Sequence, residues 1–155
     1  MFDKAEQLCK NRFNELIKQQ NIGIQLVEYT KPQERWDAIA YSATSNTKKG
    51  ILVELKYRNY PMSFFNTHKP YLKQPKLIGI INRRKELYPS HISKLAIIYV
   101  VFASDGTLIY NLSSNLEDYK WYECYLPINN FTDEYEYIQM TELNDNMLIH
   151  KITNN

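Results

Sequence analysis

Glycine, proline, cysteine and histidine are all scarce in this sequence of 155 residues, and long apolar runs are absent. With 4 glycines and 6 prolines, the chain does not have the composition of a low-complexity or disordered protein. No run approaches the roughly 18 apolar residues that mark a membrane span, and charge begins at residue 3, so we expect no signal peptide. We therefore expect one globular domain, residues 1–155, in the cytoplasm.

The scarce cysteines and histidines do not have the spacing of metal ligands. Cys9 and Cys124 lie far apart in the chain and are expected to be free thiols. His68, His91 and His150 are scattered, so we assign them no role.

What the sequence does contain is an uneven distribution of charge. Residues 1–100 hold 17 Lys and Arg against 8 Asp and Glu, whereas residues 101–155 hold 2 against 9. A basic front portion can attract a polyanion. The alternative is that solvated faces differ in charge by chance, and the charge count does not separate the two.

Hydrophobic periodicity predicts an α/β order of elements. Apolar residues at helical spacing predict helices over residues 3–20 and 69–89. Alternating or continuous apolar runs predict strands at 24–29, 35–42, 50–57, 94–103, 108–112, 120–127 and 134–143. Short connections, including a polar one at 43–50, favour antiparallel pairing of the first three strands, and the second helix allows the strand at 94–103 to run parallel to a neighbour. We expect a mixed central sheet flanked by helices, with extra C-terminal strands.

Charged residues interrupt two of these strands. In the stretch GILVELKYRN, Glu54 and Lys56 are two residues apart, so they point to the same face of the strand. In the preceding strand, alternation places Trp36, Ala38 and Ala40 on one face, with Asp37, Ile39 and Tyr41 on the other.

If these strands pair as a hairpin, Asp37 and Glu54 meet on one face. Two carboxylates in apolar surroundings repel each other, and a divalent cation such as Mg²⁺ or Mn²⁺ relieves both the repulsion and the cost of burial. A lysine beside that ion can orient or deprotonate an attacking water. The alternative is that Glu54 and Lys56 form an ion pair on an edge strand.

The pattern resembles the PD-(D/E)XK nuclease superfamily, which includes many restriction endonucleases and Holliday-junction resolvases. The family core is helix, three strands, helix, strand, with an acid on the second strand and (D/E)-x-K on the third, matched here by Asp37 and ELK at 54–56. The proline that often precedes the first acid is replaced by Trp36. The resemblance covers residues 3–103 and implies a restriction-endonuclease-like fold. Residues 104–155 match nothing in the family.

The resemblance implies a role for each matched residue. Asp37, Glu54 and the backbone carbonyl of Leu55 would hold Mg²⁺, which Mn²⁺ can replace, with Glu6 of the first helix binding directly or through water. Glu15 is the second choice for that helical acid. Lys56 would position the attacking water, and Lys76 or Gln74 on the second helix would contact water or phosphate. The implied activity is Mg-dependent hydrolysis of DNA phosphodiester bonds.

The expected partner is DNA, and a monomer and a homodimer are both compatible with the sequence. Candidate phosphate contacts are Lys73 and the basic stretch NRRKEL, namely Arg83, Arg84 and Lys85, for which a solvated helix face is the alternative. If the chain is encoded by a phage, it would act in DNA processing or be associated with the virion. Two further hypotheses stay open: a nuclease fold with a structural or DNA-binding role and no turnover, and an unrelated α/β interaction module.

Overall fold

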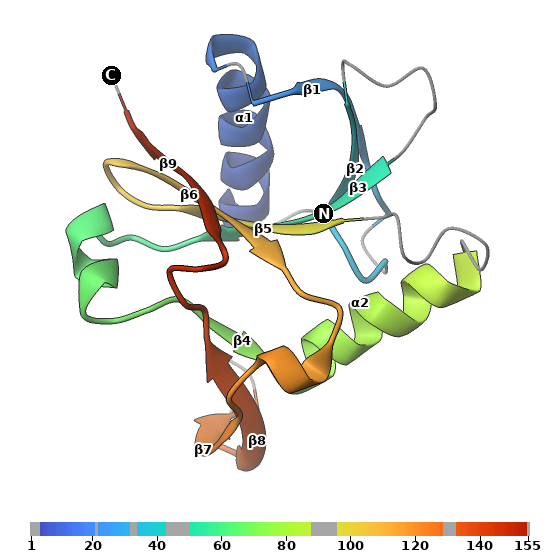
Figure 1. Cartoon of the computed structure of the whole chain (residues 1–155). Coiled ribbons are helices and arrows are strands. Elements are labelled where there is room, and N and C mark those ends of the chain that lie inside the picture. Colours follow the sequence, from blue (N-terminus) through green and yellow to red (C-terminus); the bar gives the residue numbers. More distant parts are fainter. Residues whose placement is uncertain are drawn as a thin grey trace.

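The computed structural model describes residues 4–20, 22–31, 34–42, 50–87, 96–128 and 133–154. Within them the chain forms two α-helices, nine strands and two short 3-10 helices (Figure 1). The elements are α1 (Lys4–Gln19), β1 (Ile24–Tyr29), β2 (Ala38–Ser42), β3 (Gly50–Tyr57), η1 (Met62–Asn66), β4 (Tyr71–Lys73), α2 (Gln74–Leu87), β5 (Ile97–Phe102), β6 (Gly106–Leu112), η3 (Leu116–Asp118), β7 (Tyr122–Pro127), β8 (Tyr135–Glu142) and β9 (Leu148–Thr153). The expected mixed α/β class is confirmed.

Six strands form one mixed sheet in the order β1-β2-β3-β5-β6-β9. Only the β3–β5 pair is parallel, and the chain between these two strands includes α2. The other neighbours in this sheet are antiparallel. Within the described residues, neither helix is long and apolar enough to cross a membrane.

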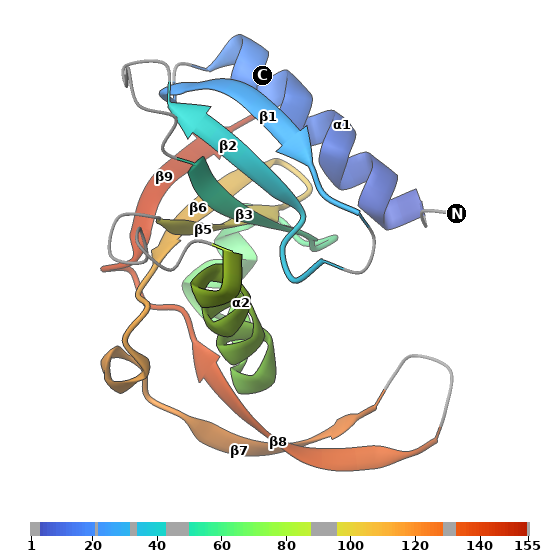
Figure 2. The ribbon, with the colours of Figure 1, turned by 90° about the vertical axis from the view of Figure 1, so that its right-hand side faces the viewer.

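The two helices cover opposite faces of this sheet (Figure 2). Cys9, Phe13 and Leu16 recur along α1 at helical spacing and pack on the face that carries Val53 and Leu55. On the other face, Leu77 and Ile80 of α2 pack with Leu52, Tyr99 and Val101. Because side chains alternate along a strand, Glu54 lies on the α2 side of β3, between Leu52 and Lys56.

The second helix begins later than the periodicity predicts. Residues 71–73 are extended because they pair with β8, and α2 starts at Gln74 with Pro75 in its first turn. A proline is tolerated there because the first turn has no use for its missing N–H. The predicted helix residues 88–89 and the first residues of the strand predicted at 94–103 lie outside the described residues.

The strands after β6 do not simply extend the central sheet. β4, β8 and β7 form a separate three-stranded sheet, which lies below α2 in Figure 2. β9, which the sequence does not predict, pairs with β6 at the edge of the large sheet. Both cysteines lie outside any disulfide bond, as expected.

The predicted faces of the second strand are partly wrong. Ala38 and Ala40 pack on the α1 side, but Trp36 packs on the α2 side together with Ile39. β2 begins only at Ala38, and residues 34–37 form a bend, so the alternation of a strand does not extend back to Trp36. The predicted polar connection at 43–49 lies outside the described residues.

Candidate functional site

The end of the β2–β3 ladder places Asp37 close to Glu54. Ala38, the first residue of β2, pairs with Val53, and Asp37 lies just before that ladder, where it lines one pocket together with Glu54. The Asp37 N–H donates to the Val53 carbonyl at 2.9 Å, and the Leu55 N–H donates to Asp37 Oδ2 at 2.7 Å. The Asp37 carboxylate is therefore held against the backbone of β3.

Two pockets meet at these residues. We call the first the carboxylate pocket; its volume is about 370 Å³, and its lining includes Glu6, Lys10, Asp37, Glu54, Lys56 and Arg58. The second, the lysine pocket, has a volume of about 400 Å³ and is lined by Glu54, Lys56, Arg58, Tyr71, Leu72, Lys73, Lys76 and Tyr99. Glu54, Lys56 and Arg58 belong to both, so they connect the two hollows.

Glu54 is the most perturbed acid of the site. It is only 8% exposed, and its Oε1 forms an ion pair with Lys76 Nζ at 3.0 Å. Its other oxygen, Oε2, is buried and has no hydrogen-bond partner among the described residues. Burial first and the charge of Asp37 second raise the pKa of Glu54 to about 7, against the opposing effects of Lys76 and Lys56. Metal-free, this carboxyl is therefore only partly ionised at neutral pH.

Lys56 is perturbed in the opposite direction. Loss of solvation lowers the pKa of Lys56, and the positive charges of Arg58, Lys76 and Lys73 lower it further, while Glu54 opposes the change. Its side chain keeps contact with solvent where the two pockets join. A lysine with a lowered pKa has a larger neutral fraction, which can accept a proton.

The donors at this point fit a hard divalent cation. Asp37 and Glu54 supply carboxylate oxygens, and the unpartnered Glu54 Oε2 is an acceptor that such an ion would satisfy. In a strand, the N–H and C=O of one residue point to the same neighbour, so the Leu55 carbonyl lies on the edge to which Asp37 is bonded. Two carboxylates and one carbonyl leave positions for water, as Mg²⁺ prefers.

Glu6 belongs to the pocket but is not a close third ligand. Its side chain lines the carboxylate pocket and lies 3.7 Å from Lys10 one turn along α1. Within the described residues, no three His, Cys, Asp or Glu side chains lie close enough to enclose a metal ion. Of the two alternatives for Glu6, contact through water fits this arrangement better. Glu15 lies in another pocket, beside the second half of α1.

Of the site residues predicted on α2 or next to it, some line the two pockets and others do not. Lys76 and Lys73 line the lysine pocket, whereas Gln74, the first residue of α2, lines neither pocket. Arg83 is bonded to Glu34 at 3.0 Å and to Glu86 at 2.9 Å.

Arg84 and Lys85 differ in their surroundings. The Arg84 side chain is 2% exposed and donates to Ser114 Oγ at 2.8 Å, so the prediction of Arg84 as a phosphate contact does not fit its burial. Lys85 remains exposed.

Sequence reasoning missed Arg58 and Tyr71. Arg58 lines both pockets, and its guanidinium lies 5.4 Å from the centre of the Tyr71 ring. A signal for Arg58 was present, because it follows Lys56 by two residues, the spacing that also relates Lys56 to Glu54. No comparable signal marks Tyr71, whose position depends on the pairing of β4 with β8.

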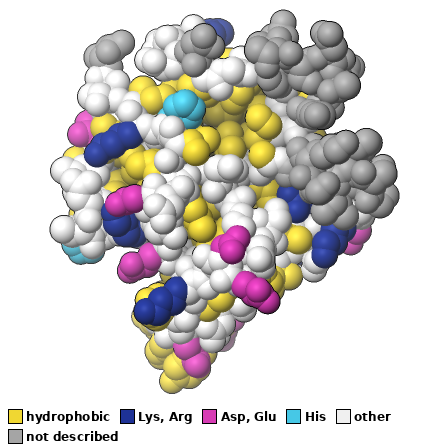
Figure 3. Space-filling model, viewed as in Figure 1, with side chains coloured by type: hydrophobic (Ala, Val, Ile, Leu, Met, Phe, Trp, Pro, Cys, Tyr) yellow, Lys and Arg dark blue, Asp and Glu magenta, His cyan; other side chains and the backbone are white. Residues whose placement is uncertain are grey.

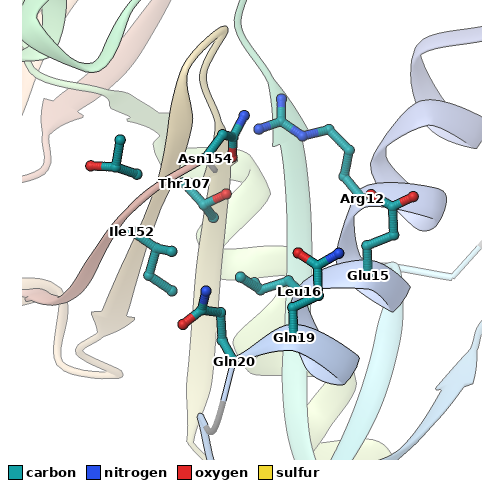
Figure 4. A pocket seen from close by; sticks show the side chains of 9 residues that line it. Arg12, Glu15, Leu16, Gln19, Gln20, Thr107, Ile152 and Asn154 are labelled. Atoms are coloured by element: carbon teal, nitrogen blue, oxygen red, sulfur yellow. The ribbon is translucent and has the colours of Figure 1, made fainter.

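A larger pocket lies elsewhere along α1. This arginine pocket of about 580 Å³ lies between the second half of α1 and strands β6 and β9, and its lining includes Arg12, Glu15, Thr107 and Asn154 (Figure 4). Arg12 donates to the carbonyls of Ala103 at 2.6 Å and Gly106 at 3.0 Å, so its guanidinium joins α1 to the turn before β6. Glu15 is the only acid among its lining residues.

Comparison with known proteins adds no relative to this picture. A scan against protein-family models, a search of curated proteins and a search of solved structures each found no match. The chemistry of the chain must therefore be argued from its own residues.

Proposed function

We propose that the protein is a metal-dependent nuclease that hydrolyses DNA phosphodiester bonds. The observation that carries the proposal is the pairing of Asp37 and Glu54 in one pocket with Lys56, where a buried Glu54 oxygen has no partner in the described residues. Two carboxylates with an uncompensated acceptor favour a cation, and a neighbouring lysine of lowered pKa suits a reaction that needs a base.

The arrangement of elements supports the same proposal. The order α1, β1, β2, β3, α2, β5, with β3 parallel to β5, is similar to the αβββαβ core of the PD-(D/E)XK nucleases. Asp37, immediately before the second strand, and Glu54-Leu55-Lys56 on the third are placed similarly to the residues of the family motif. Fold likeness raises the expectation of nuclease chemistry, while the site carries the proposal itself.

Each residue has a definite task in this proposal. Asp37, Glu54 and the Leu55 carbonyl would hold Mg²⁺ or Mn²⁺, with Glu6 acting through water. Bound there, the ion supplies positive charge to the scissile phosphate and lowers the pKa of the attacking water. Lys56 orients that water and can accept its proton.

Lys76 stands where it can exchange its bond with Glu54 for one with a phosphate oxygen. Gln74, at the start of the same helix, is the weaker candidate for this contact because it lines neither pocket.

Cleavage of plasmid and branched DNA in the presence of Mg²⁺ tests the proposal. We expect nicking by the wild-type protein, loss of nicking with EDTA, and loss in a Lys56→Ala variant. The matched control is Lys18→Ala, which removes an exposed lysine of α1 outside both pockets and should leave cleavage unchanged. Wild-type protein that leaves every DNA intact with Mg²⁺ and with Mn²⁺ would contradict the proposal.

One contact favours a second candidate, DNA binding without turnover. The 3.0 Å ion pair between Lys76 and Glu54 partly neutralises the carboxylate without a metal. In that case the lysines alone would hold the phosphates, and DNA binding would not require Mg²⁺, which would only compete with the lysines for the phosphates. Binding that persists in EDTA, together with no cleavage under any condition, would favour this candidate over the nuclease.

A further inference from the structure

The lysine pocket continues onto the small sheet. Tyr71 lines the lysine pocket and also a further hollow of about 260 Å³, the hairpin pocket, whose lining includes Lys69, Tyr122, Cys124, Met140 and Glu142. A continuous surface therefore runs from Glu54 of β3 past Tyr71 to β7. Nothing in the proposed chemistry uses the part of this surface beyond Lys76.

Two exposed aromatic rings mark this surface. Tyr71 is 43% exposed and Tyr122 is 46% exposed. The ladder pairs Lys73 with Met140 and Met140 with Tyr122, so Lys73 and Tyr122 lie on one face of the small sheet, two strands apart. Tyr71 shares that face because it is two residues from Lys73. The spacing of strands puts the two rings on the order of 10 Å apart.

Each ring has a cation over one of its two faces. Arg58 lies 5.4 Å from the centre of the Tyr71 ring, and Lys120 Nζ lies 5.3 Å from that of Tyr122. A ring for stacking next to a cation for a phosphate is the combination used by proteins that bind single-stranded nucleic acid.

The charges along the surface favour a polyanion. The lysine pocket presents Lys56, Arg58, Lys73 and Lys76 against the single carboxylate of Glu54. The hairpin pocket has no excess of positive charge: Lys69 is bonded to Asp145 at 2.8 Å, and Glu142 is a further acid of the lining. Positive charge is therefore greatest beside the carboxylates, and the aromatic rings extend the surface away from them.

The opposite face of the same hairpin has a different character. The Tyr125 ring packs there in a tilted arrangement against Tyr135 and Tyr137, with ring centres 5.2 and 4.8 Å apart, and hydrophobic side chains gather over this end of the molecule (Figure 3). None of these three tyrosines lines the hairpin pocket or the lysine pocket, and none has a cation recorded over its ring among the described residues. They provide a matched control for the rings on the cationic side.

We propose that single-stranded DNA is the ligand of this surface, running from the carboxylate pocket over Tyr71 to Tyr122. Bases stack on the two rings, and Arg58, Lys73 and Lys120 contact the phosphates. Only unpaired bases expose the faces that such stacking needs, so the substrate class is single-stranded or frayed DNA. This inference rests on the proposed nuclease function, because that function is the reason to place one part of the DNA strand at Asp37 and Glu54.

Binding measured without metal tests the inference independently of cleavage. Fluorescence anisotropy in EDTA would follow a labelled DNA strand about 15 nucleotides long, the upper range of such sites. We expect Tyr71→Ala and Tyr122→Ala each to weaken binding at least about five-fold, as removal of a stacking ring does. Tyr71→Phe should bind like the wild type because it keeps the ring, and Tyr137→Ala should have no effect.

The outcomes separate this inference from the proposed function. The inference would be overturned if the wild-type protein did not bind the strand, or if the Tyr71→Ala variant bound it as tightly as the wild type. It would also be overturned if the wild type bound a duplex of the same length with equal affinity. If plasmid is cleaved but the binding test gives one of these results, the proposed nuclease function holds and the proposed single-stranded DNA site is wrong. If binding depends on the tyrosine rings but no DNA is cleaved, the single-stranded DNA site holds and the nuclease function is wrong. Thermal melts of each variant identify any loss of folding.

Discussion

The carboxylate pocket and the arginine pocket flank the two halves of α1 and differ in how their charges are satisfied. In the arginine pocket, the Arg12 guanidinium donates to two backbone carbonyls, and the pocket has a single acid. In the carboxylate pocket, Glu54 shares its surroundings with Asp37 and keeps one buried oxygen without a partner among the described residues.

The larger hollow is therefore not the better candidate for chemistry. The arginine pocket has about 580 Å³ against about 370 Å³ for the carboxylate pocket, yet its charged group joins α1 to the turn before β6. An incompletely satisfied buried acid raises the energy of the metal-free fold, and such groups cluster at functional sites. The contrast between a satisfied cation and an unsatisfied anion can be tested by changing one residue of each pocket at a time.

The largest effect is expected from Asp37→Asn. The substitution keeps the shape, and the Asn side-chain oxygen can still accept from the Leu55 N–H, but the charge that holds a cation is lost. We expect DNA cleavage to fall at least about 100-fold, because metal assistance supplies several kcal/mol. Metal-free stability should stay the same or rise, since repulsion with Glu54 is removed.

Melting with and without Mg²⁺ distinguishes a ligand from a structural partner. Mg²⁺ should raise the melting temperature of the wild type by mass action and leave that of Asp37→Asn nearly unchanged. A wild-type protein indifferent to millimolar Mg²⁺ and Mn²⁺, combined with a lower melting temperature for Asp37→Asn, would instead mean that these charges form a structural ion network.

The pKa of Glu54 predicts a change of stability with pH. The folded protein holds a proton on Glu54 up to about pH 7, whereas the unfolded chain releases it near 4.5, the ordinary pKa of a glutamate. The folded state therefore binds more protons between these values, and the metal-free free energy of unfolding falls as pH rises through this window. The difference corresponds to roughly 3 kcal/mol.

Denaturant unfolding in EDTA at several pH values measures this effect. Glu54→Gln cannot titrate, so it should lack the part of the decline that Glu54 contributes, and the two curves should converge below about pH 4.5. Parallel curves for the wild type and Glu54→Gln from pH 4 to 8 would show that Glu54 is ionised throughout and that its charge is satisfied within the protein.

A substitution in the arginine pocket should lower the stability of the protein and leave its cleavage activity unchanged. Arg12→Gln removes charge-assisted hydrogen bonds to Ala103 and Gly106, and we expect the free energy of unfolding to fall by about 2 kcal/mol. Cleavage per folded molecule should be unchanged. Loss of cleavage without loss of stability would mean that this pocket, and not the one beside Asp37, serves the reaction.

The smallest effect is expected from the acids of α1. Glu6→Gln should lower the affinity for Mg²⁺ about three-fold or less, because Glu6 lines the carboxylate pocket without being a close third ligand. Glu15→Gln, its counterpart in the arginine pocket, should have no effect on Mg²⁺ affinity. Titration of the Mg²⁺ dependence of the melting temperature compares the two, and an equal response from both would remove Glu6 from the site.

The sequence predicted the central elements well because their patterns are local. Apolar spacing defined α1 to within a residue or so, and the third strand spans Gly50–Tyr57 as expected. β9 was missed because LIHKIT is short and half polar and has no clear strand pattern of its own. It is a strand because it pairs with β6. Likewise β4 is extended only because β8 lies beside it.

The same distinction applies to the site. The sequence predicted that Asp37, Glu54 and Lys56 lie together because Glu54 and Lys56 are two residues apart and Asp37 belongs to the preceding segment of the predicted hairpin, and all three line the carboxylate pocket. Arg84 looked like its neighbours in a basic helical stretch, and its burial and its bond to Ser114 depend on a segment distant in the chain. Tyr71 and Tyr122 come together through a ladder between distant segments, which a single sequence does not encode in any local pattern.

The parallel contact between β3 and β5 has a kinetic consequence. The β2–β3 ladder beside the two acids joins residues close in the chain, whereas η1, β4 and α2 lie between β3 and β5 in the sequence. Local ladders form early in folding, and distant pairings form late because their loop closure costs more entropy. The hairpin should therefore form with Glu54 still hydrated and ionised. Docking of β5 and α2 then buries it, so near pH 6 the last stage of folding should take up a proton from solvent.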